Sequence, residues 1–238
     1  MEPAPFYRNC FEYDAAVPER HTHPQFGEWD QMQQRTNQVL YAYWNDVRGD
    51  RIAPRRFDVE PSQLGSVLAE TFILECGADQ PPVFRLAGTR ICDTFGREFR
   101  GAGFLELFRP DDRAAITTHL ADVKVQGAVL VVTATATIDA RRSVTFEIML
   151  LPLIHTGASI SRMLGAVAVI DAPGWLGSER LPPLELTAHS RIWPDGRPFA
   201  VVEKFRSAPA LLPELAGARL VRVNRRSFRV LDGGLVKN

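Results

Sequence analysis

The residues from Val129 to Asp139 alternate between an entirely apolar set and a set rich in threonine, which constrains the fold more than any other feature of the chain. The two sets of alternating positions are Leu130, Val132, Ala134, Ala136 and Ile138 on one side, and Val131, Thr133, Thr135 and Thr137 on the other. A period of two residues is typical of a β-strand whose two faces meet different surroundings. The run therefore predicts a long strand with one strongly apolar face.

Four further segments carry strand patterns, and they surround a block of helices. The expected strands run over residues 70–76, 83–87, 144–150 and 163–171. A helix with the apolar stripe Ile116, Leu120 and Val123 precedes the alternating run, and Asp111 or Asp112 stands where its N-cap belongs. Antiparallel strands with helices between the second and third of them give an α+β domain with a five-stranded sheet and flanking helices.

The stretch from Val83 to Gly96 joins a strand to a short helix. It reads V-F-R-L-A-G-T-R-I-C-D-T-F-G, with Phe84 and Leu86 expected on one side of the strand and Arg85 on the other. The strand breaks at Gly88. A short helical pattern of Ile91, Cys92 and Phe95 follows the break.

A second motif precedes this stretch. The pattern W-x-x-x-R-G-x-x-x-x-P-x-R-x-D-x-x-P is met by Trp44, Arg48, Gly49, Pro54, Arg56, Asp58 and Pro61. Together with R-L-A-G-T-R-I and the following F-G-R-E, this motif resembles the PAS domain, and more narrowly the fifth PAS family of bacteria. The resemblance covers roughly Trp44 to Pro173. It implies a sensory or regulatory binding module without catalytic activity, which acts through a small ligand or a signalling protein partner.

The PAS resemblance also implies a cavity between the sheet and the short helices, for a small apolar or amphipathic ligand. Its expected lining consists of Phe72, Leu74, Phe84, Leu86, Ile91, Cys92, Phe95, Phe108, Val132, Ala134, Phe146, Ile148 and Val167. The alternative is that these side chains fill one another's space, as a close-packed core requires. The arginines of this region, Arg85, Arg90, Arg97 and Arg100, are expected to serve as ion-pair partners or surface charge.

No nucleotide-binding, hydrolase or metalloprotease motif occurs in the chain. An enzyme that used the same cavity is the alternative, and its acid/base groups would have to come from Glu147, Arg85 and the acids near Asp93. Cys92 lacks the asparagine-cysteine-arginine context of flavin photoreceptors, and no haem motif is present, so the cofactor stays open. Three scattered cysteines without a C-x-x-C pair do not predict a metal site.

An amphipathic helix is expected near Trp29 to Val47. It either covers the sheet of its own domain or pairs with a second copy of itself. Because Tyr43 and Trp44 are adjacent, they point about 100° apart on a helix, so one neighbour does not cover both. We therefore expect a homodimer through Leu40, Tyr43, Trp44 and Val47.

The chain is expected to divide into an irregular arm over 1–28, the PAS-like domain over 29–175, and a linker with a small basic β-rich extension over 176–238. Arg219, Arg222, Arg225, Arg226 and Arg229 make the extension basic, which leaves nucleic-acid binding as a further alternative. Lys+Arg and Asp+Glu are both 28, so the whole chain has no charge that favours nucleic acid. The apolar runs are shorter than the roughly 20 residues that span a bilayer, and no signal-peptide pattern is seen, so we expect a cytoplasmic protein.

Overall fold

The computed structural model describes residues 31–77, 80–196, 220–223 and 226–229. The chain divides into two units, Met1–Phe199 and Ala200–Asn238, and each is described by itself. The expected arm over 1–28 lies outside the described residues. Among the described residues, no helix combines the length and the apolar character that a membrane span needs.

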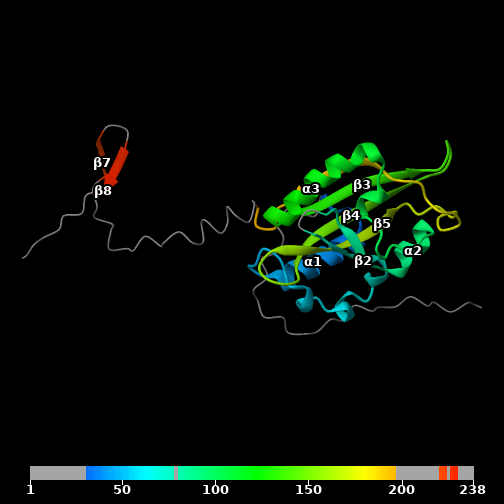
Figure 1. Cartoon of the computed structure of the whole chain (residues 1–238), viewed down its shortest axis with the longest axis horizontal. Helices are drawn as coiled ribbons and strands as arrows, with labels where there is room; N and C mark the ends of the chain where they lie inside the picture. Colours follow the sequence, from blue (N-terminus) through cyan, green and yellow to red (C-terminus); the bar gives the residue numbers. More distant parts are fainter. Residues whose placement is uncertain (1–30, 78–79, 197–219, 224–225, 230–238) are drawn as a thin grey trace, which may run out of the picture. The chain divides into compact units, whose positions relative to one another are not determined.

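The first unit is built on an antiparallel sheet with the strand order β2-β1-β5-β4-β3-β6 (Figure 1). The strands are β1 (Thr71–Glu75), β2 (Val83–Ala87), β3 (Val129–Thr137), β4 (Ser143–Ile154), β5 (Ile160–Ile170) and β6 (Glu185–Ile192). The helices are α1 (Arg35–Arg48), α2 (Thr89–Phe95) and α3 (Arg113–Gln126), with short 3₁₀ turns η2 (Arg56–Asp58), η3 (Pro61–Leu64), η4 (Leu68–Glu70), η5 (Phe104–Leu107) and η6 (Pro110–Asp112). The predicted α+β class is confirmed, and each of the five predicted strands is present.

The sheet has a sixth strand, which the sequence pattern did not predict. β6 pairs antiparallel with β3 along its outer edge, within residues 176–238, where a linker and a small extension were expected. Asp112 helps to hold it, because its Oδ2 accepts the backbone N–H of Leu186 at 2.9 Å instead of capping α3. β6 is an edge strand that is exposed over most of its length. Its outward positions hold Thr187, His189 and Arg191, so the sequence lacks the regular apolar alternation by which strands are recognised.

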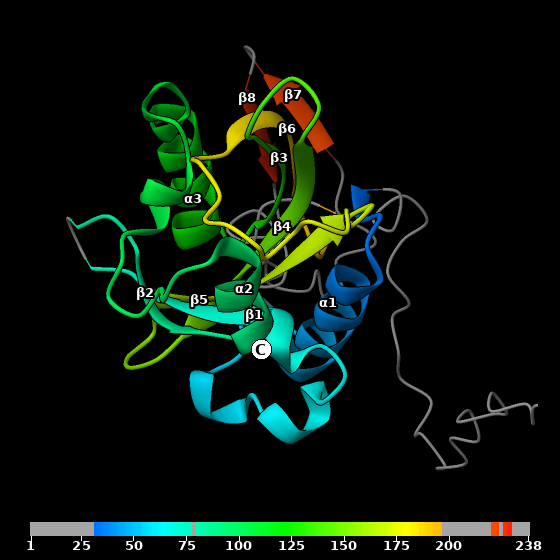
Figure 2. The same ribbon diagram turned by 90° about the vertical axis from the view of Figure 1, so that its right-hand side faces the viewer.

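The two faces of the sheet are covered by different helices (Figure 2). α2, η5 and α3 pack on one face, against Phe72, Phe146 and their neighbours. α1 packs on the opposite face, against Met149, Leu151 and Leu164. Strands buried on both faces read as nearly continuous apolar runs, and β4 is such a strand.

Helix α1 covers its own sheet, which removes the reason for expecting a homodimer through Leu40, Tyr43, Trp44 and Val47. Leu40 and Trp44 have no exposed surface, and the indole N–H of Trp44 donates to the carbonyl of Pro152 at 2.9 Å. Tyr43 is half-buried, and its hydroxyl accepts the backbone N–H of Glu60 at 2.7 Å. Val47 is half-buried as well. The sheet and the segment before η3 therefore cover the two aromatic side chains from two directions.

A β-bulge in β2 corrects the expected placement of Leu86. Leu74 pairs with Phe84 and Ile73 pairs with Leu86, so Arg85 has no partner in β1. An extra residue of this kind reverses the alternation beyond it. Phe84 consequently points into the core, whereas 48% of Leu86 is exposed.

The second unit contains the hairpin β7 (Leu220–Val223) and β8 (Arg226–Arg229). It lies in the extension over 176–238 that was expected to be β-rich. Arg219 and Arg225 lie outside the described residues.

Replacing Leu40 by Ala tests whether α1 is held by its own sheet. We expect the free energy of unfolding to fall by about 2 to 5 kcal/mol, because the change opens a cavity under the helix. The loss, measured by urea denaturation, should be the same at protein concentrations that differ tenfold. Val125→Ala, at a site that is 73% exposed, is the control. A loss that grows on dilution would support the pairing of two α1 helices instead.

Candidate functional site

Phenylalanine side chains fill the space between the sheet and the helices α2 and α3. This ring cluster consists of Phe72, Phe84, Phe95, Phe99, Phe104, Phe108 and Phe146. The ring centroids of Phe84 and Phe99 are 4.9 Å apart, and those of Phe95 and Phe146 are 5.0 Å apart. Edge-to-face and offset contacts at such distances stabilise aromatic pairs beyond their burial. The rings occupy the place where a ligand cavity was expected.

Most of the expected cavity-lining residues belong to this core. Leu74, Ile91, Val132, Ala134, Ile148 and Val167 are buried around the rings, and Cys92 packs half-buried against them. Leu86 does not line the interior, for the reason given above. Phe99 was missed because it lies in the loop after α2, where no helical spacing marks it as a core residue.

The small residue Gly165 makes room for one of these rings. A Cβ atom at this position would lie 2.2 Å from the Phe72 ring and 2.5 Å from the Met149 carbonyl oxygen. Gly165 therefore allows the aromatic core to contact the sheet closely. The close approach that glycine permits in a strand is used here by the protein's own ring.

The acid/base groups considered for an enzyme do not meet in the core. Glu147 is buried on the opposite face of the sheet, beneath the start of α1. Its carboxylate accepts the backbone N–H groups of Gln33 at 2.8 Å and Gln34 at 3.0 Å, and the side-chain amide of Asn37 at 2.8 Å. Arg85 and Asp93 are exposed. Glu147 is thus an acceptor for the N–H groups that open α1, whose N-terminal end favours negative charge.

The two described cysteines are not activated thiols. Burial raises the pKa of Cys76 to about 11, and burial together with the nearby Glu98 raises the pKa of Cys92. A raised pKa keeps a thiol protonated and weakly nucleophilic at neutral pH. Within the described ranges, no three His, Cys, Asp or Glu side chains gather in a way that could hold a metal ion.

A hollow opens at the rim of the ring cluster, where residues 174–184 cross the end of α2. These residues, called the strap below, were expected to be a linker. The strap docks closely because Gly96, in the left-handed region at φ 62°, has no side chain: a Cβ atom there would lie 3.2 Å from the Arg180 Cα. Further along, Leu184 donates its N–H to the carbonyl of Leu107 at 2.7 Å and leads into β6.

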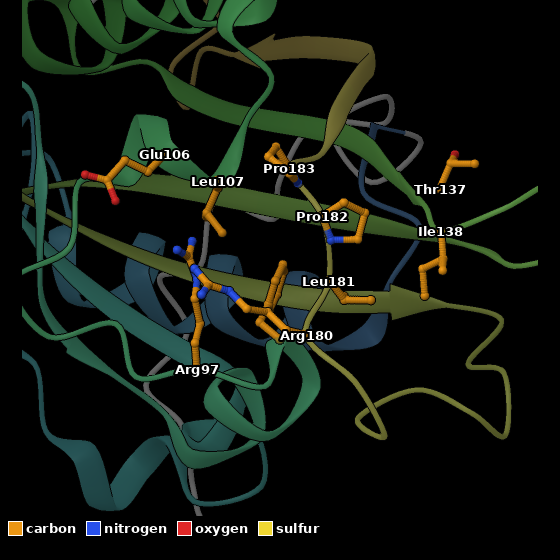
Figure 3. A pocket seen from close by; sticks show the side chains of 10 residues that line it. Arg97, Glu106, Leu107, Thr137, Ile138, Arg180, Leu181, Pro182 and Pro183 are labelled. Atoms are coloured by element: carbon orange, nitrogen blue, oxygen red, sulfur yellow. The ribbon is translucent and has the colours of Figure 1, made fainter.

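This hollow, the rim pocket, has a volume of about 490 Å³ (Figure 3). Its walls come from the end of α2, from η5, from the end of β3 and from the strap. The lining residues are Phe95, Arg97, Glu106, Leu107, Thr137, Ile138, Arg180, Leu181, Pro182 and Pro183. Of the cavity residues expected from the sequence, it includes Phe95.

Two arginine side chains line the rim pocket, one from the end of α2 and one from the strap. Figure 3 shows the guanidinium groups of Arg97 and Arg180 next to each other, with the Glu106 carboxylate pointing away from them. Burial and the neighbouring Arg180 lower the pKa of Arg97, while Glu106 acts in the opposite direction. The neighbouring strap carboxylate of Glu179 is paired with Arg142.

A second hollow, of about 360 Å³, lies between η4, α2 and β5 and includes Ile91 and Val167 in its lining. Its arginine behaves as expected from the sequence, because Arg90 pairs with Glu70 at 2.7 Å. Arg97 differs: its guanidinium carbon lies 4.5 Å from the centroid of the Phe99 ring, and it makes no ion pair within 4 Å in the described part of the chain.

The fold is therefore that of an α+β domain with a filled aromatic core and a hollow at its rim. The family model of the PAS domain, in its fifth subfamily, matches residues 32–168, which is more than half of the chain. The chain belongs to the PAS domain family, as its sequence predicted.

Among solved structures, the chain is similar to the Rhodobacter sphaeroides LOV protein, with 19% identity and a TM-score of 0.35 over 44% of this chain and 61% of that one. A variant of the same LOV protein gives 19% identity and a TM-score of 0.35, over 44% of this chain and 62% of that one. The matched part thus spans less than two thirds of either LOV chain. No curated protein sequence matches the chain.

Replacing Ala134 by Met tests whether the interior is filled. Ala134 is fully buried opposite Phe146, so the added atoms have no free space. We expect the free energy of unfolding to fall by about 1 to 3 kcal/mol, as is typical of overpacked cores. Ala114→Met, the same change at an exposed position of α3, should be nearly neutral. Equal stability of both variants in urea denaturation would mean that a cavity adjoins Ala134.

Replacing Glu147 by Ala tests its role at the start of α1. Three N–H donors lose their acceptor, so we expect a loss of unfolding free energy on the order of 3 kcal/mol at pH 7. Glu147→Gln should also destabilise, because its amide presents a donor to other donors. Glu75→Ala, at an exposed position of β1, serves as the control. A Glu147→Ala variant as stable as this control would contradict the assignment.

Proposed function

We propose that the chain is a non-catalytic PAS binding module of bacterial, cytoplasmic signalling, and that its small-ligand site is the rim pocket. The observation that carries the proposal is the strap. It forms one wall of the pocket and continues directly into β6, the edge strand that pairs with β3. A ligand in the pocket would contact α2, the end of β3 and the strap together.

Binding rather than catalysis is favoured by where the buried polar groups lie. Glu147 is a buried carboxylate in a sheet whose other face is aromatic, and it is engaged by three N–H donors on the α1 side. General acid/base chemistry needs a titratable group within hydrogen-bond reach of the substrate. At the rim pocket the charged groups are arginines and Glu106, which suit recognition by charge.

The strap could transmit ligand binding to the part of the chain that follows it. A ligand that binds only when the strap is docked stabilises the docked state by an amount that grows with its concentration relative to its Kd. The docked strap keeps Leu184 against Leu107 and Phe108 and aligns β6 with β3. Occupancy of the pocket would thus be communicated to the segment that follows β6.

A thermal-shift screen of anionic, neutral and cationic small molecules, with native mass spectrometry of the freshly purified chain, tests this function. A compound present at about 100 times its Kd should stabilise the fold by roughly 2.7 kcal/mol and slow proteolysis within the strap. Ile138→Trp narrows the pocket and should remove the stabilisation. Thr117→Trp, at an exposed site on α3, should leave it unchanged.

Stabilisation that survives in the Ile138→Trp variant would place the ligand elsewhere and contradict the proposal. The proposal would also fail if no compound of any charge class shifted the melting temperature. Turnover of a stabilising compound by the purified chain would favour the enzyme alternative.

A further inference from the structure

We propose that the rim pocket binds a small organic carboxylate with an apolar body, whose oxygens accept hydrogen bonds from the guanidinium groups of Arg97 and Arg180. This inference rests on the proposed function, because it assigns a ligand class to the same pocket. Four observations support it: the surroundings of Arg97, the position of Arg180, the net charge of the pocket lining and the apolar character of its other walls.

Arg97 is a half-buried cation that has no carboxylate partner within 4 Å among the residues that the structure describes. One face of its guanidinium lies on the Phe99 ring, with the guanidinium carbon 4.5 Å from the ring centroid. The ring fixes the orientation of the guanidinium and leaves its N–H edge for other acceptors. Removing a cation from water is costly unless hydrogen-bonding partners replace the water. A ligand oxyanion would supply such partners.

Arg180 is brought to the same place by the backbone of the strap. The absence of a side chain at Gly96 lets the Arg180 backbone approach the end of α2, and Gly177 similarly approaches the carbonyl of Asp93. Glu179, its neighbour in sequence, is held by Arg142, which also pairs with Asp139 at 2.7 Å. Arg142, in the turn between β3 and β4, thus pairs with the strap carboxylate, so that Glu179 is not the partner of Arg180.

The charge balance of the pocket favours a monoanion. Two arginines and Glu106 are its charged lining residues, so the lining carries a net charge of plus one. The two guanidinium groups repel each other, which is consistent with the lowered pKa of Arg97. Guanidinium groups bind carboxylates through paired N–H donors. A bound carboxylate would relieve the repulsion and neutralise the pocket.

The remaining walls are apolar and select for the body of the ligand. Phe95, Leu107, Ile138, Leu181 and Pro182 line the pocket together with the two arginines. A volume of about 490 Å³ lies in the range of small-molecule sites, which are mostly apolar with a few oriented polar groups. The pocket thus suits a molecule with one charged end and one apolar end.

The test uses 3-phenylpropionate as the probe, with its uncharged amide as the matched control, in calorimetric titrations of the full chain. We expect the acid to bind and the amide to bind at least tenfold more weakly. Arg97→Gln and Arg180→Gln should each weaken binding of the acid by about tenfold to a hundredfold, the range for hydrogen bonds to charged groups. Arg100→Gln removes a neighbouring exposed charge and should leave binding unchanged.

Equal affinity for the acid and the amide, or an affinity unchanged in both Arg97→Gln and Arg180→Gln, would overturn the inference. Tighter binding of phenyl phosphate than of 3-phenylpropionate would overturn the choice of a carboxylate. If only neutral compounds bind, and Ile138→Trp abolishes their binding, the pocket function stands and the carboxylate inference falls. If no compound of any class binds, both fall. Unchanged far-ultraviolet circular dichroism of each variant confirms that it is folded.

Discussion

The packing of phenylalanine rings between the sheet and its helices is the interaction on which the rest of the structure depends. Phe72 and Phe146 come from the sheet, and Phe95 and Phe99 come from the end of α2 and the loop after it. Because these rings contact one another directly, they set the distance between the two layers. Because the rings fill the interior, the rim pocket lies at the edge of the ring cluster, where the strap crosses α2.

In the described part of the chain, the opposite face of the sheet is packed without a cluster of phenylalanine rings. There α1 lies on aliphatic side chains, and the buried carboxylate of Glu147 receives the N–H groups at its start. At the other end of α1, Arg48 pairs with Asp195 at 3.2 Å, just after β6. Polar contacts therefore hold both ends of α1, through Glu147 of β4 at its start and Asp195 at its end. Between them, the apolar face of the helix packs on the sheet.

Local sequence patterns were sufficient to predict the strands of the sheet and the family of the chain. The position of the rim pocket depends on contacts between residues far apart in the sequence. The alternation around Leu130 and Val132 was sufficient to predict β3. The bulge at Arg85 depends on pairing with β1, which the sequence of β2 alone does not contain, so Leu86 was placed on the wrong face. β6 was missed because an exposed edge strand need not alternate. Arg97 and Arg180 lie far apart in the sequence, and only the close approach at Gly96 brings them into one pocket.

Methyl-resolved NMR under xenon pressure tests most directly whether the interior is filled and the hollow lies at the rim. Xenon enters empty apolar cavities. We expect the methyl signals of Val132, Ile148 and Val167 to stay nearly unshifted, with any shifts confined to Ile138 and Leu181 at the rim pocket. Saturable xenon-dependent shifts at Val132 and Ile148 would reveal a cavity inside the ring cluster and would contradict this account.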